Sequence, residues 1–505
     1  MSSSVKAVRG CGGWGIGLLL ACAFMGSRAL AGGTVGTGSP DSCTESALDA
    51  ALAGGGSVTF NCGSDPVTIT LTGPKTITSK TSVDGGGLIT LSGNDASQVF
   101  IINKKRLAFN LANLTIRDGL ANGASGAPAR GGAVYNVGML SVTNCTFSNN
   151  HASSSQGSQG GAIDNLGTLT VTGSTFDNNG AATTNSSSFA EGGAILNGGR
   201  LQITNSQFTD NSAEAGLAFG GAIDNLGRLS ATNTIFSYNS VIQGLGGAIH
   251  NLGPLATLST CSFVSNDAPG AWGGGAIYND SILKVADSTF VGNTGFSGGA
   301  IFTSGDTKLT VTGSTFANNT STTIGGGIGS EEGKVSVANS TFFQNSAVTG
   351  GGAIEDDYWS TLTVLSSTFV DNAAENGKGS AISGVAVVVN TIIAATQPAD
   401  NCDYPLTDGG HNTDSGASCG FGQHHGSLSN TDPNLDPVGL ADNGGPTQTI
   451  AVDAGSPAID NGKEAACRAA PVKKHDQRGF VRPGTGSTKC TIGAYEFNSP
   501  GPSSH

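Results

Sequence analysis

Residues 159–179 read QGGAIDNLGTLTVTGSTFDNN, and residues 219–239 read FGGAIDNLGRLSATNTIFSYN. Both stretches begin near a Gly-Gly-Ala-Ile element, continue with a run in which apolar and polar residues alternate, and end with a Phe followed three residues later by Asn. Two copies this similar within one chain indicate an internal repeat. A repeat of this kind decides the architecture before any single residue does.

The repeat fills the middle of the chain, with nine copies and a degenerate tenth that opens at Gly379. The nine Gly-Gly elements begin at Gly131, Gly160, Gly192, Gly220, Gly246, Gly274, Gly298, Gly325 and Gly351. Sixteen to eighteen residues after each start lies a Phe, which gives the column Phe147, Phe176, Phe208, Phe236, Phe263, Phe290, Phe316, Phe342 and Phe369. Three residues after each Phe lies an Asn, which gives the column Asn150, Asn179, Asn211, Asn239, Asn266, Asn293, Asn319, Asn345 and Asn372.

The composition and the length of the unit together predict the fold class. The chain contains 80 glycines and only 12% charged residues, so the charged helix formers are scarce and β structure with many turns is favoured. Successive starts are 24 to 32 residues apart, and the extra residues fall in small-residue tracts such as residues 181–191, which predict loops. A unit of about 27 residues with three short strands suits one coil of a parallel β-helix, because propeller blades need about 40 residues or more.

We therefore expect an all-β protein, a right-handed parallel β-helix of about ten regular coils with further N-terminal coils and an irregular C-terminal region. Stacked coils place equivalent residues about 4.8 Å apart, so the Phe column predicts an internal aromatic stack and the Asn column a hydrogen-bonded ladder. A second ladder is expected five residues after the first Gly, formed by Asn136, Asn165, Asn197, Asn225, Asn251 and Asn279 and continued by Thr303, Ser330 and Asp356.

The first residues have the character of an export signal. Lys6 and Arg9 precede the apolar run WGIGLLLACAFMG, and Ala29-Leu30-Ala31 offers a cleavage site, so the mature chain is expected to begin near Gly32. Leu19-Leu20-Ala21-Cys22 also has the form of a lipoprotein cleavage box. Since the signal holds three basic residues and no acid, cleavage would take the formal charge from -13 to -16, which disfavours nucleic acid as a partner. No later segment is apolar over the roughly 20 residues that span a bilayer.

Export also predicts disulfide bonds. Of the eight cysteines that follow the signal, three pairs are close in sequence, and we expect Cys43 with Cys62, Cys402 with Cys419, and Cys467 with Cys490. Cys145 and Cys261 lie four coils apart, about 19 Å at 4.8 Å per coil, so they should remain reduced inside the core.

The alternation of GGAI and F-x-x-N between residues 131 and 372 resembles the repeats of polymorphic outer-membrane proteins, which are surface-exposed β-helical adhesins. The flanks resemble exported bacterial β-helix proteins with a choice-of-anchor Q region, through VTFNCGSDPVTITLT, SVDGGGLITLSG and LANLTIRDG and through DPNLDP, ADNGGPTQT, SPAIDNG, DQRGFVRP and TIGAYEF. In this terminal signature, an Arg paired with Asp460 or Glu496 would brace the region. The fold also resembles that of pectin lyases.

These observations divide the chain into four parts. We expect a signal peptide at residues 1–31, an N-terminal cap and first coils at 32–120, regular coils at 121–395, and a C-terminal capping, choice-of-anchor Q-like region at 396–505 that packs against the β-helix.

Two groups of residues are candidates for chemistry. The column four residues after the first Gly should point outward, and it places Asp224, His250 and Tyr278 on successive coils, where they would serve acid–base catalysis if the protein is an enzyme. A varied, solvated surface column explains the same residues more simply. The densest acid group holds Glu331, Glu332, Glu355, Asp356 and Asp357, with Tyr358 and Trp359 beside it, and it is a candidate for Ca²⁺ or, more simply, an acidic loop ridge.

The sequence thus favours a secreted or cell-surface, monomeric protein without catalytic activity, an adhesin or matrix-contact protein whose partner is an extracellular carbohydrate or a surface protein. It needs no cofactor beyond the Ca²⁺ considered above. The alternative is a carbohydrate-active enzyme of the pectin-lyase-like class, a polysaccharide lyase or a glycoside hydrolase, because a fold does not determine a function.

Overall fold

The fold is described from a computed structural model. It covers residues 32–123, 126–183, 185, 187–270, 272–376, 379–395, 400–422 and 425–501. The predicted signal peptide and its cleavage site therefore lie outside the described residues.

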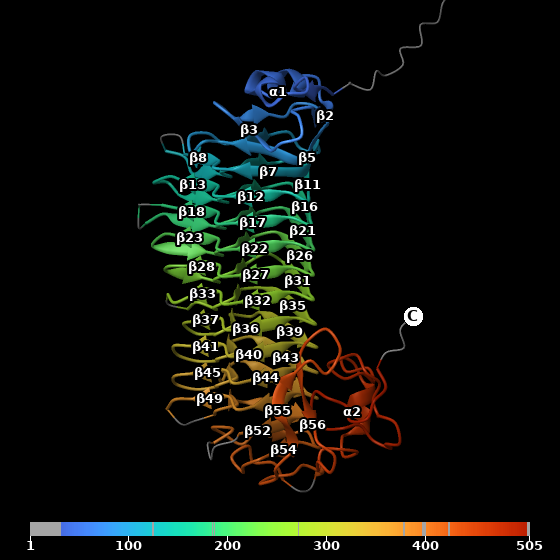
Figure 1. Cartoon of the computed structure of the whole chain (residues 1–505). Coiled ribbons are helices and arrows are strands. Elements are labelled where there is room, and N and C mark those ends of the chain that lie inside the picture. The colour runs from blue at the N-terminus through green and yellow to red at the C-terminus, as the bar shows by residue number, and fades with distance from the viewer. Residues whose placement is uncertain are drawn as a thin grey trace, which may run out of the picture.

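The chain winds into a parallel β-helix, as predicted, with the coils stacked in sequence order along one axis (Figure 1). One coil shows how the repeat is used. It contains β15 (Ile163–Asn165), β16 (Thr168–Thr172), β17 (Thr175–Asp177), β18 (Gly180–Ala182) and β19 (Phe189–Glu191). The first three strands enclose the core, and the last two form an arm outside it.

Equivalent strands of successive coils pair in parallel and build four sheets. A twelve-stranded sheet runs from β4 (Lys75–Thr76) to β50 (Ile382–Gly384) and includes β15. A 27-stranded sheet joins the strands equivalent to β16 and β17. A ten-stranded sheet contains β18, and a five-stranded sheet contains β19.

The paired glycines are required where the chain leaves the arm and enters the twelve-stranded sheet. Gly160 has φ +65°, and a Cβ atom on it would lie 2.1 Å from the carbonyl oxygen of Ile163. At Gly161 a Cβ would lie 2.0 Å from the carbonyl oxygen of Gly193 in the next coil. One Gly therefore supplies the left-handed conformation and the other permits the close approach of neighbouring coils.

The Phe column forms the predicted internal stack. All nine rings, from Phe147 to Phe369, are fully buried, and successive ring centroids lie 4.6 to 5.1 Å apart. The rings face one another at interplanar angles of 15° or less, so the register of the strands is carried through the core.

Both predicted Asn ladders are present. In the first, Asn239 donates from Nδ2 to Oδ1 of Asn266 at 3.0 Å and to the carbonyl oxygen of Phe208 at 2.9 Å. In the second, Asn225 donates from Nδ2 to Oδ1 of Asn251 at 2.8 Å. These bonds satisfy polar groups that would otherwise be costly to bury.

Tracts such as residues 181–191 were expected to be loops, but the two ends of this tract belong to strands of the arm, β18 and β19, so the expectation of three strands per coil was too small. The ten- and five-stranded sheets share a small apolar cluster made by Ala181, Ala190, Ala213, Ala218, Val241 and Ala268. Small side chains in both sheets allow them to lie close together. A tract rich in Ala therefore reads as a loop in sequence but packs as paired strands.

The N-terminal end of the β-helix is covered by α1 (Glu45–Leu52), whose Leu48 is fully buried (Figure 1). The hydroxyl of Thr44 accepts a hydrogen bond from the Ala47 amide and so caps this helix. The predicted disulfide between Cys43 and Cys62 fastens the helix to the first coil. Covering this end shields strand edges that would otherwise pair with other chains.

The C-terminal region begins by extending the solenoid. β53 (Thr407–Asp408) and β54 (Thr413–Asp414) pair with the last strands of the 27-stranded sheet, and the predicted Cys402–Cys419 disulfide lies here. The chain then turns back along the outside of the solenoid with the hairpin of β55 (Leu435–Ala441) and β56 (Thr449–Val452), followed by α2 (Glu464–Arg468) (Figure 1).

Threonines on the outer face of the 27-stranded sheet anchor this returning segment. Thr315 donates from Oγ1 to the carbonyl oxygen of Gln448 at 2.6 Å, and Thr341 donates to Oε1 of Gln477 at 2.6 Å. The Ala494 amide donates to Oγ1 of Thr368 at 2.9 Å. The three contacts lie on successive coils, so the segment packs along the axis.

Buried charges brace the same segment. Arg482 lies 3.5 Å from Glu496, one of the two acids predicted to hold an Arg, and both side chains are inaccessible to solvent. Asp460 instead accepts a hydrogen bond from the Thr488 amide at 2.8 Å. The predicted Cys467–Cys490 disulfide closes the region, while Cys145 and Cys261 are buried and free as expected.

Candidate functional site

Two columns of side chains meet where the arm joins the β-helix. One is the column four residues after the first Gly, on the outer face of the twelve-stranded sheet. The other directly precedes each Gly pair, on the five-stranded sheet. We call the ionisable residues that meet there, with Gln159, the ionisable corner: Arg130, Gln159, Asp164, Glu191, Asp224, His250 and Asp280.

The first column points away from the core as predicted, but it is not a solvated surface. Asp224 is 1% exposed, His250 3% and Tyr278 7%. Phe219 of the five-stranded sheet packs against His250, with ring centroids 5.0 Å apart. The solvated-surface interpretation was therefore wrong, because it took no account of the arm.

His250 is held between two carboxylates. Its Nδ1 lies 2.8 Å from Asp224 Oδ1, and its Nε2 lies 3.4 Å from Asp280 Oδ2. Burial alone would lower the pKa of the imidazole, but the charge of Asp224 and the hydrogen bonds to both acids outweigh it and raise the pKa to about 9. His250 is therefore an imidazolium at neutral pH, with both nitrogens donating.

In the other half of the ionisable corner, nearby positive charge offsets little of the cost of burying the acids. Burial raises the pKa of Asp164 to about 7, against the charge of Arg130, whose Nη1 lies 3.8 Å from Asp164 Oδ2. Burial and the charge of Asp224 also raise the pKa of Glu191, which accepts a hydrogen bond from Gln159 Nε2 at 2.7 Å.

The chemistry open to this cluster is limited by its protonation and its access. A general base needs a lone pair that is unprotonated at the working pH. His250 is protonated at neutral pH, and both of its ring nitrogens are bonded to carboxylates. Tyr278 lies beside it, with ring centroids 5.7 Å apart, and burial raises the pKa of the phenol to about 12. The structure thus brings the three predicted residues together in an arrangement that favours a structural charge cluster.

Sequence reasoning missed Arg130, Glu191 and Asp280. The first two belong to the column that precedes each Gly pair, which continues in the arm as Phe219 and Leu245, in register across the five-stranded sheet. That column is visible in the repeat alignment, so it was an available signal. Its contact with the other column depends on the arm, which the sequence analysis predicted to be loops.

The predicted acid group does not converge on one point. Asp356 lies in register with Ser330 in the column of the second ladder and is 1% exposed, but the hydrogen bonds from one ladder residue to the next reach only as far as the bond from Asn279 to Thr303, so the expected continuation through Ser330 to Asp356 is not formed. Its neighbour Glu355 lies on the opposite face of the same strand and is partly exposed. Asp357 accepts hydrogen bonds from the amides of Glu332 and Trp359. Burial, followed by the charge of Asp357, raises the pKa of Asp356 to about 8.

The remaining acids of this group stay nearer the surface. Glu331 is partly exposed and Glu332 exposed. Burial raises the pKa of Glu355 to about 7. Over the described ranges, no group of three or more His, Cys, Asp or Glu side chains is arranged to hold a metal ion. The acid group therefore has the form of an acidic ridge beside the exposed aromatic pair Tyr358 and Trp359.

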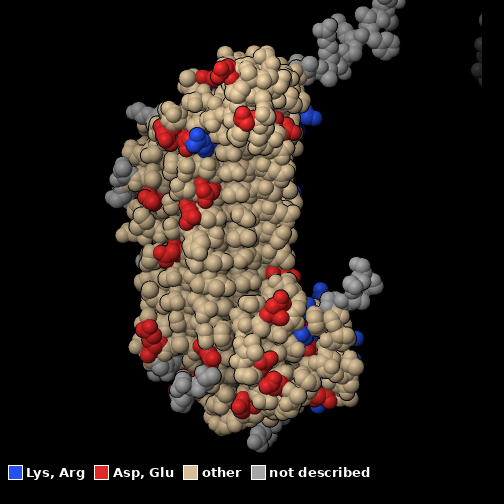
Figure 2. All heavy atoms as spheres, in the orientation of Figure 1, with Lys and Arg blue, Asp and Glu red and all other residues tan. Residues whose placement is uncertain are grey.

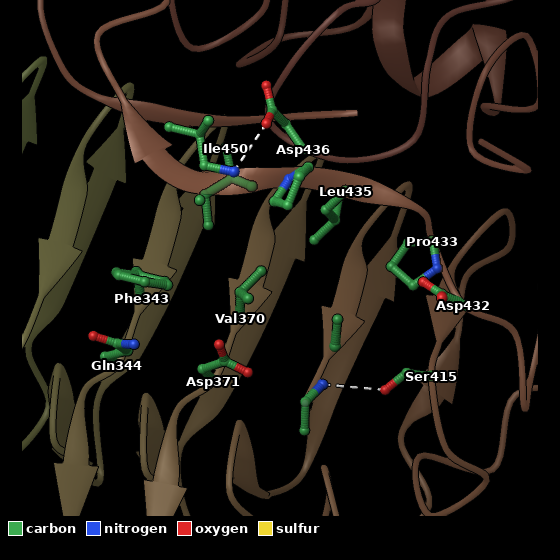
Figure 3. A pocket seen from close by; sticks show the side chains of 15 residues that line it. Phe343, Gln344, Val370, Asp371, Ser415, Asp432, Pro433, Leu435, Asp436 and Ile450 are labelled. Carbon is green, nitrogen blue, oxygen red and sulfur yellow. Dashed lines mark hydrogen bonds between the residues drawn. The ribbon is translucent and has the colours of Figure 1, made fainter. Parts of the chain in front are cut away.

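A groove lies on another face, between the returning hairpin and the outer surface of the solenoid (Figure 3). Its volume is about 640 Å³. Its floor comes from β44 (Thr341–Phe343), β48 (Thr368–Val370) and β52 (Ile392–Ala394), and its roof comes from β55 and β56. We call it the hairpin groove. The sequence motifs do not predict this groove, since its two sides are far apart in the chain.

The charge of the surface agrees with the acidic composition. Figure 2 shows acidic side chains gathered around the C-terminal region and along one edge of the coils, with few basic ones on this face. The broad middle of the 27-stranded sheet on this side is largely uncharged (Figure 2). Such a surface disfavours polyanionic partners.

Comparison with known proteins gives one family match. Residues 144–165 match the Chlamydia polymorphic membrane protein repeat, a span that runs from the Phe147 and Asn150 columns of one coil to the second ladder of the next. Searches of curated proteins and of solved structures found no match. In the described part of the chain, no helix has the length and apolar character needed to cross a membrane. The match supports a β-helix built from repeats similar to those of polymorphic membrane proteins.

Proposed function

We propose that this chain is an exported, surface-associated β-helix protein that acts by binding, without catalysis, in adhesion or matrix contact. The observation that carries the proposal is the match of residues 144–165 to a repeat associated with bacterial surface proteins, in a chain whose coils repeat the same pattern. The three disulfides agree with an oxidising location.

The geometry of the ionisable corner supports binding over catalysis. Of the three residues predicted for acid–base catalysis, His250 has a pKa of about 9, which keeps it protonated at neutral pH. The covering arm also separates it from any large polymer. The rigid stack of coils suits a protein that presents surfaces at a fixed spacing.

A carbohydrate-active enzyme is the second candidate, and the hairpin groove is the observation that favours it. Asp371, Asp432 and Asp436 line this groove, and paired carboxylates are the usual machinery of glycoside hydrolysis. The two functions differ in one outcome, the release of shorter saccharides.

The test uses the mature protein, residues 32–505. It is incubated with immobilised matrix proteins and with a panel of neutral and uronate polysaccharides, with and without Ca²⁺. Binding without the appearance of reducing ends or unsaturated products is expected. Cleavage that disappears in Asp224→Asn, His250→Gln or Asp436→Asn would replace the adhesion proposal with the enzymatic one, and failure to bind any surface component would refute adhesion.

A further inference from the structure

We propose that the hairpin groove is a binding site for a saccharide that carries no anionic group, lying along the axis of the β-helix. The inference rests on the proposed binding function, because it names the ligand class of that function and its location. Nothing in the repeat pattern or the family match points to this groove.

The floor of the groove presents two parallel rows. Phe343, Val370 and Ala394 are in register on adjacent strands and form an apolar row on the outer face. Gln344, Asp371 and Ala395 follow them in the chain and form a second, more polar row in the turn (Figure 3). Adjacent strands are about 4.8 Å apart, so each row repeats at that spacing.

This pairing of rows suits a pyranose ring. A sugar has an apolar C–H face that packs on apolar or aromatic side chains, and a rim of hydroxyls that needs hydrogen-bond partners. Phe343 is partly exposed and offers its ring to the groove, and Val370 extends the apolar surface. The carboxylate of Asp371 and the amide of Gln344 lie where the ring edges would be (Figure 3).

The roof of the groove is already formed in the absence of a ligand. Leu435 pairs with Val452 in the hairpin, and Leu435 and Val452 belong to an apolar cluster that includes Ile392 of the solenoid. The hydrogen bond from Thr315 to Gln448 holds the same hairpin from the side. A site formed in advance loses less conformational freedom on binding.

The hydrogen-bonding character of the walls selects the ligand. Among the described residues, fifteen line the groove, and these include three aspartates, Asp371, Asp432 and Asp436, and no Lys, Arg or His. Asp436 accepts from the Val438 amide at 2.9 Å through Oδ1, and Asp432 accepts from the Asn434 amide at 2.8 Å through Oδ1. Because an ionised carboxylate offers about four acceptor positions, capacity remains for a ligand that donates.

The groove therefore matches hydroxyl and ammonium donors and repels carboxylates and sulfates. Neutral glycans and amino-sugar glycans share this donor-rich chemistry, whereas polyuronates do not. The volume of about 640 Å³ falls within the range of about 300–1,000 Å³ that is typical of ligand sites. A Lys- or Arg-rich peptide also matches the negative charge of the groove, but it does not match the apolar row on the floor.

The experiment measures binding of defined oligosaccharides to the mature protein by calorimetry and by saturation-transfer NMR. One arm uses neutral gluco-, xylo- and N-acetylchito-oligosaccharides, a second uses glucosamine oligomers, a third uses oligogalacturonates, and a fourth uses a basic peptide. We expect binding in the first or second arm only. Weak salt dependence identifies a neutral ligand, and strong salt dependence identifies the amino sugar.

Two variants locate the site, and one matched variant controls for stability. Phe343→Ser and Asp436→Asn are each expected to weaken binding at least tenfold. Val264→Ser changes the equivalent third residue of β32 (Ser262–Val264), three coils away and outside the groove, and should leave affinity unchanged. Unchanged thermal midpoints would assign the losses to the groove.

The outcomes separate this inference from the proposed function. A saccharide bound equally by all three variants, a preference for oligogalacturonates or the basic peptide, or no binding in any arm would overturn the groove assignment, while adhesion could still be measured on matrix proteins. Cleavage of a saccharide that binds in the groove would uphold the groove and refute the non-catalytic function.

Discussion

Replacing Phe236 by Ala should remove one ring from the middle of the aromatic stack. The side chain is fully buried, and its ring centroid lies 5.1 Å from that of Phe208 and 4.9 Å from that of Phe263. Loss of a buried Phe side chain, together with the cavity that it leaves, lowers the free energy of unfolding by about 3–5 kcal/mol. Each stacked contact is worth about 0.5–1.5 kcal/mol beyond area, so the two neighbours place the expected cost in the upper half of that range.

The matched control lies one residue away. Ile235 is on the same strand, β27 (Ile235–Ser237), but points outward and is 41% exposed. Ile235→Ala should cost about 1 kcal/mol or less, because much of this side chain is already in water. Since alternate residues of a strand face opposite ways, the pair tests the register of the strand with the same local backbone.

The assay is amide hydrogen exchange read peptide by peptide, combined with urea unfolding. A solenoid is stabilised through contacts between neighbouring coils, so Phe236→Ala should increase exchange most around Phe208 and Phe263 and least near α1. Equal costs for the two variants, or a loss below about 1 kcal/mol for Phe236→Ala, would refute the stacked-column argument.

Three further predictions concern polar groups. Truncation of the ladder in Asn239→Ala should cost about 2–4 kcal/mol, because the partners of both ends of the amide are left unsatisfied, and a loss under about 0.5 kcal/mol in urea unfolding would contradict the ladder. The folded pKa of Asp356 is about 8, above its usual value of 3.8, so ionisation of this group should lower the stability of the protein as pH rises from about 4 to 8. Asp356→Asn should therefore raise the thermal midpoint at pH 8 but not at pH 4. An equal gain at both pH values would exclude titration of Asp356 as the cause. His250, with its folded pKa raised to about 9, contributes stability that is complete below about pH 6.5 and is lost as pH passes 9. Its ring signals in NMR, assigned with His250→Gln, should remain those of imidazolium at pH 7.5. Titration of the ring near pH 6.5 would contradict its position between the two carboxylates.

The core of this fold was predictable because the repeat imposes one environment on each column. A Phe three residues before an Asn recurs in nine successive coils, and in-register stacking turns that recurrence into the observed ring stack and ladder. The disulfides followed from the short spacing of the cysteines and from the expectation of export. The ring stack and the ladder needed only contacts between neighbouring coils, and the disulfides only cysteines close in sequence.

The ionisable corner was predictable only in part. The position of Asp224 next to His250 followed from the same stacking rule and is observed at 2.8 Å. The burial of this pair did not, because it depends on the arm packing across the column. The arm consists of two-to-three-residue strands, in which alternation is too short to be recognised.

The hairpin groove required information that no coil contains by itself. The third residue of the Phe-containing strand changes along the chain, from Ser148 and Asp177 in early coils to Phe343 and Val370 in late ones. Taken alone, this drift describes an outer face that becomes apolar toward the C-terminal end. The returning hairpin lies over part of that face, and the space between the hairpin and the face is the groove (Figure 3).

The same drift explains why a binding site would form at this end and not along the whole rod. A stack of identical coils presents identical surfaces, so it gives a ligand no preferred position. Here the apolar row and the docked segment coincide only over β44, β48 and β52, which breaks the repetition at one place. A ligand confined to the groove should therefore bind with a stoichiometry of one per chain, whereas a ligand that reads the repeated Thr, Ser and Asn faces should bind at several places; calorimetry that returned several equivalent sites would mean that the repeated faces, and not the groove, hold the ligand.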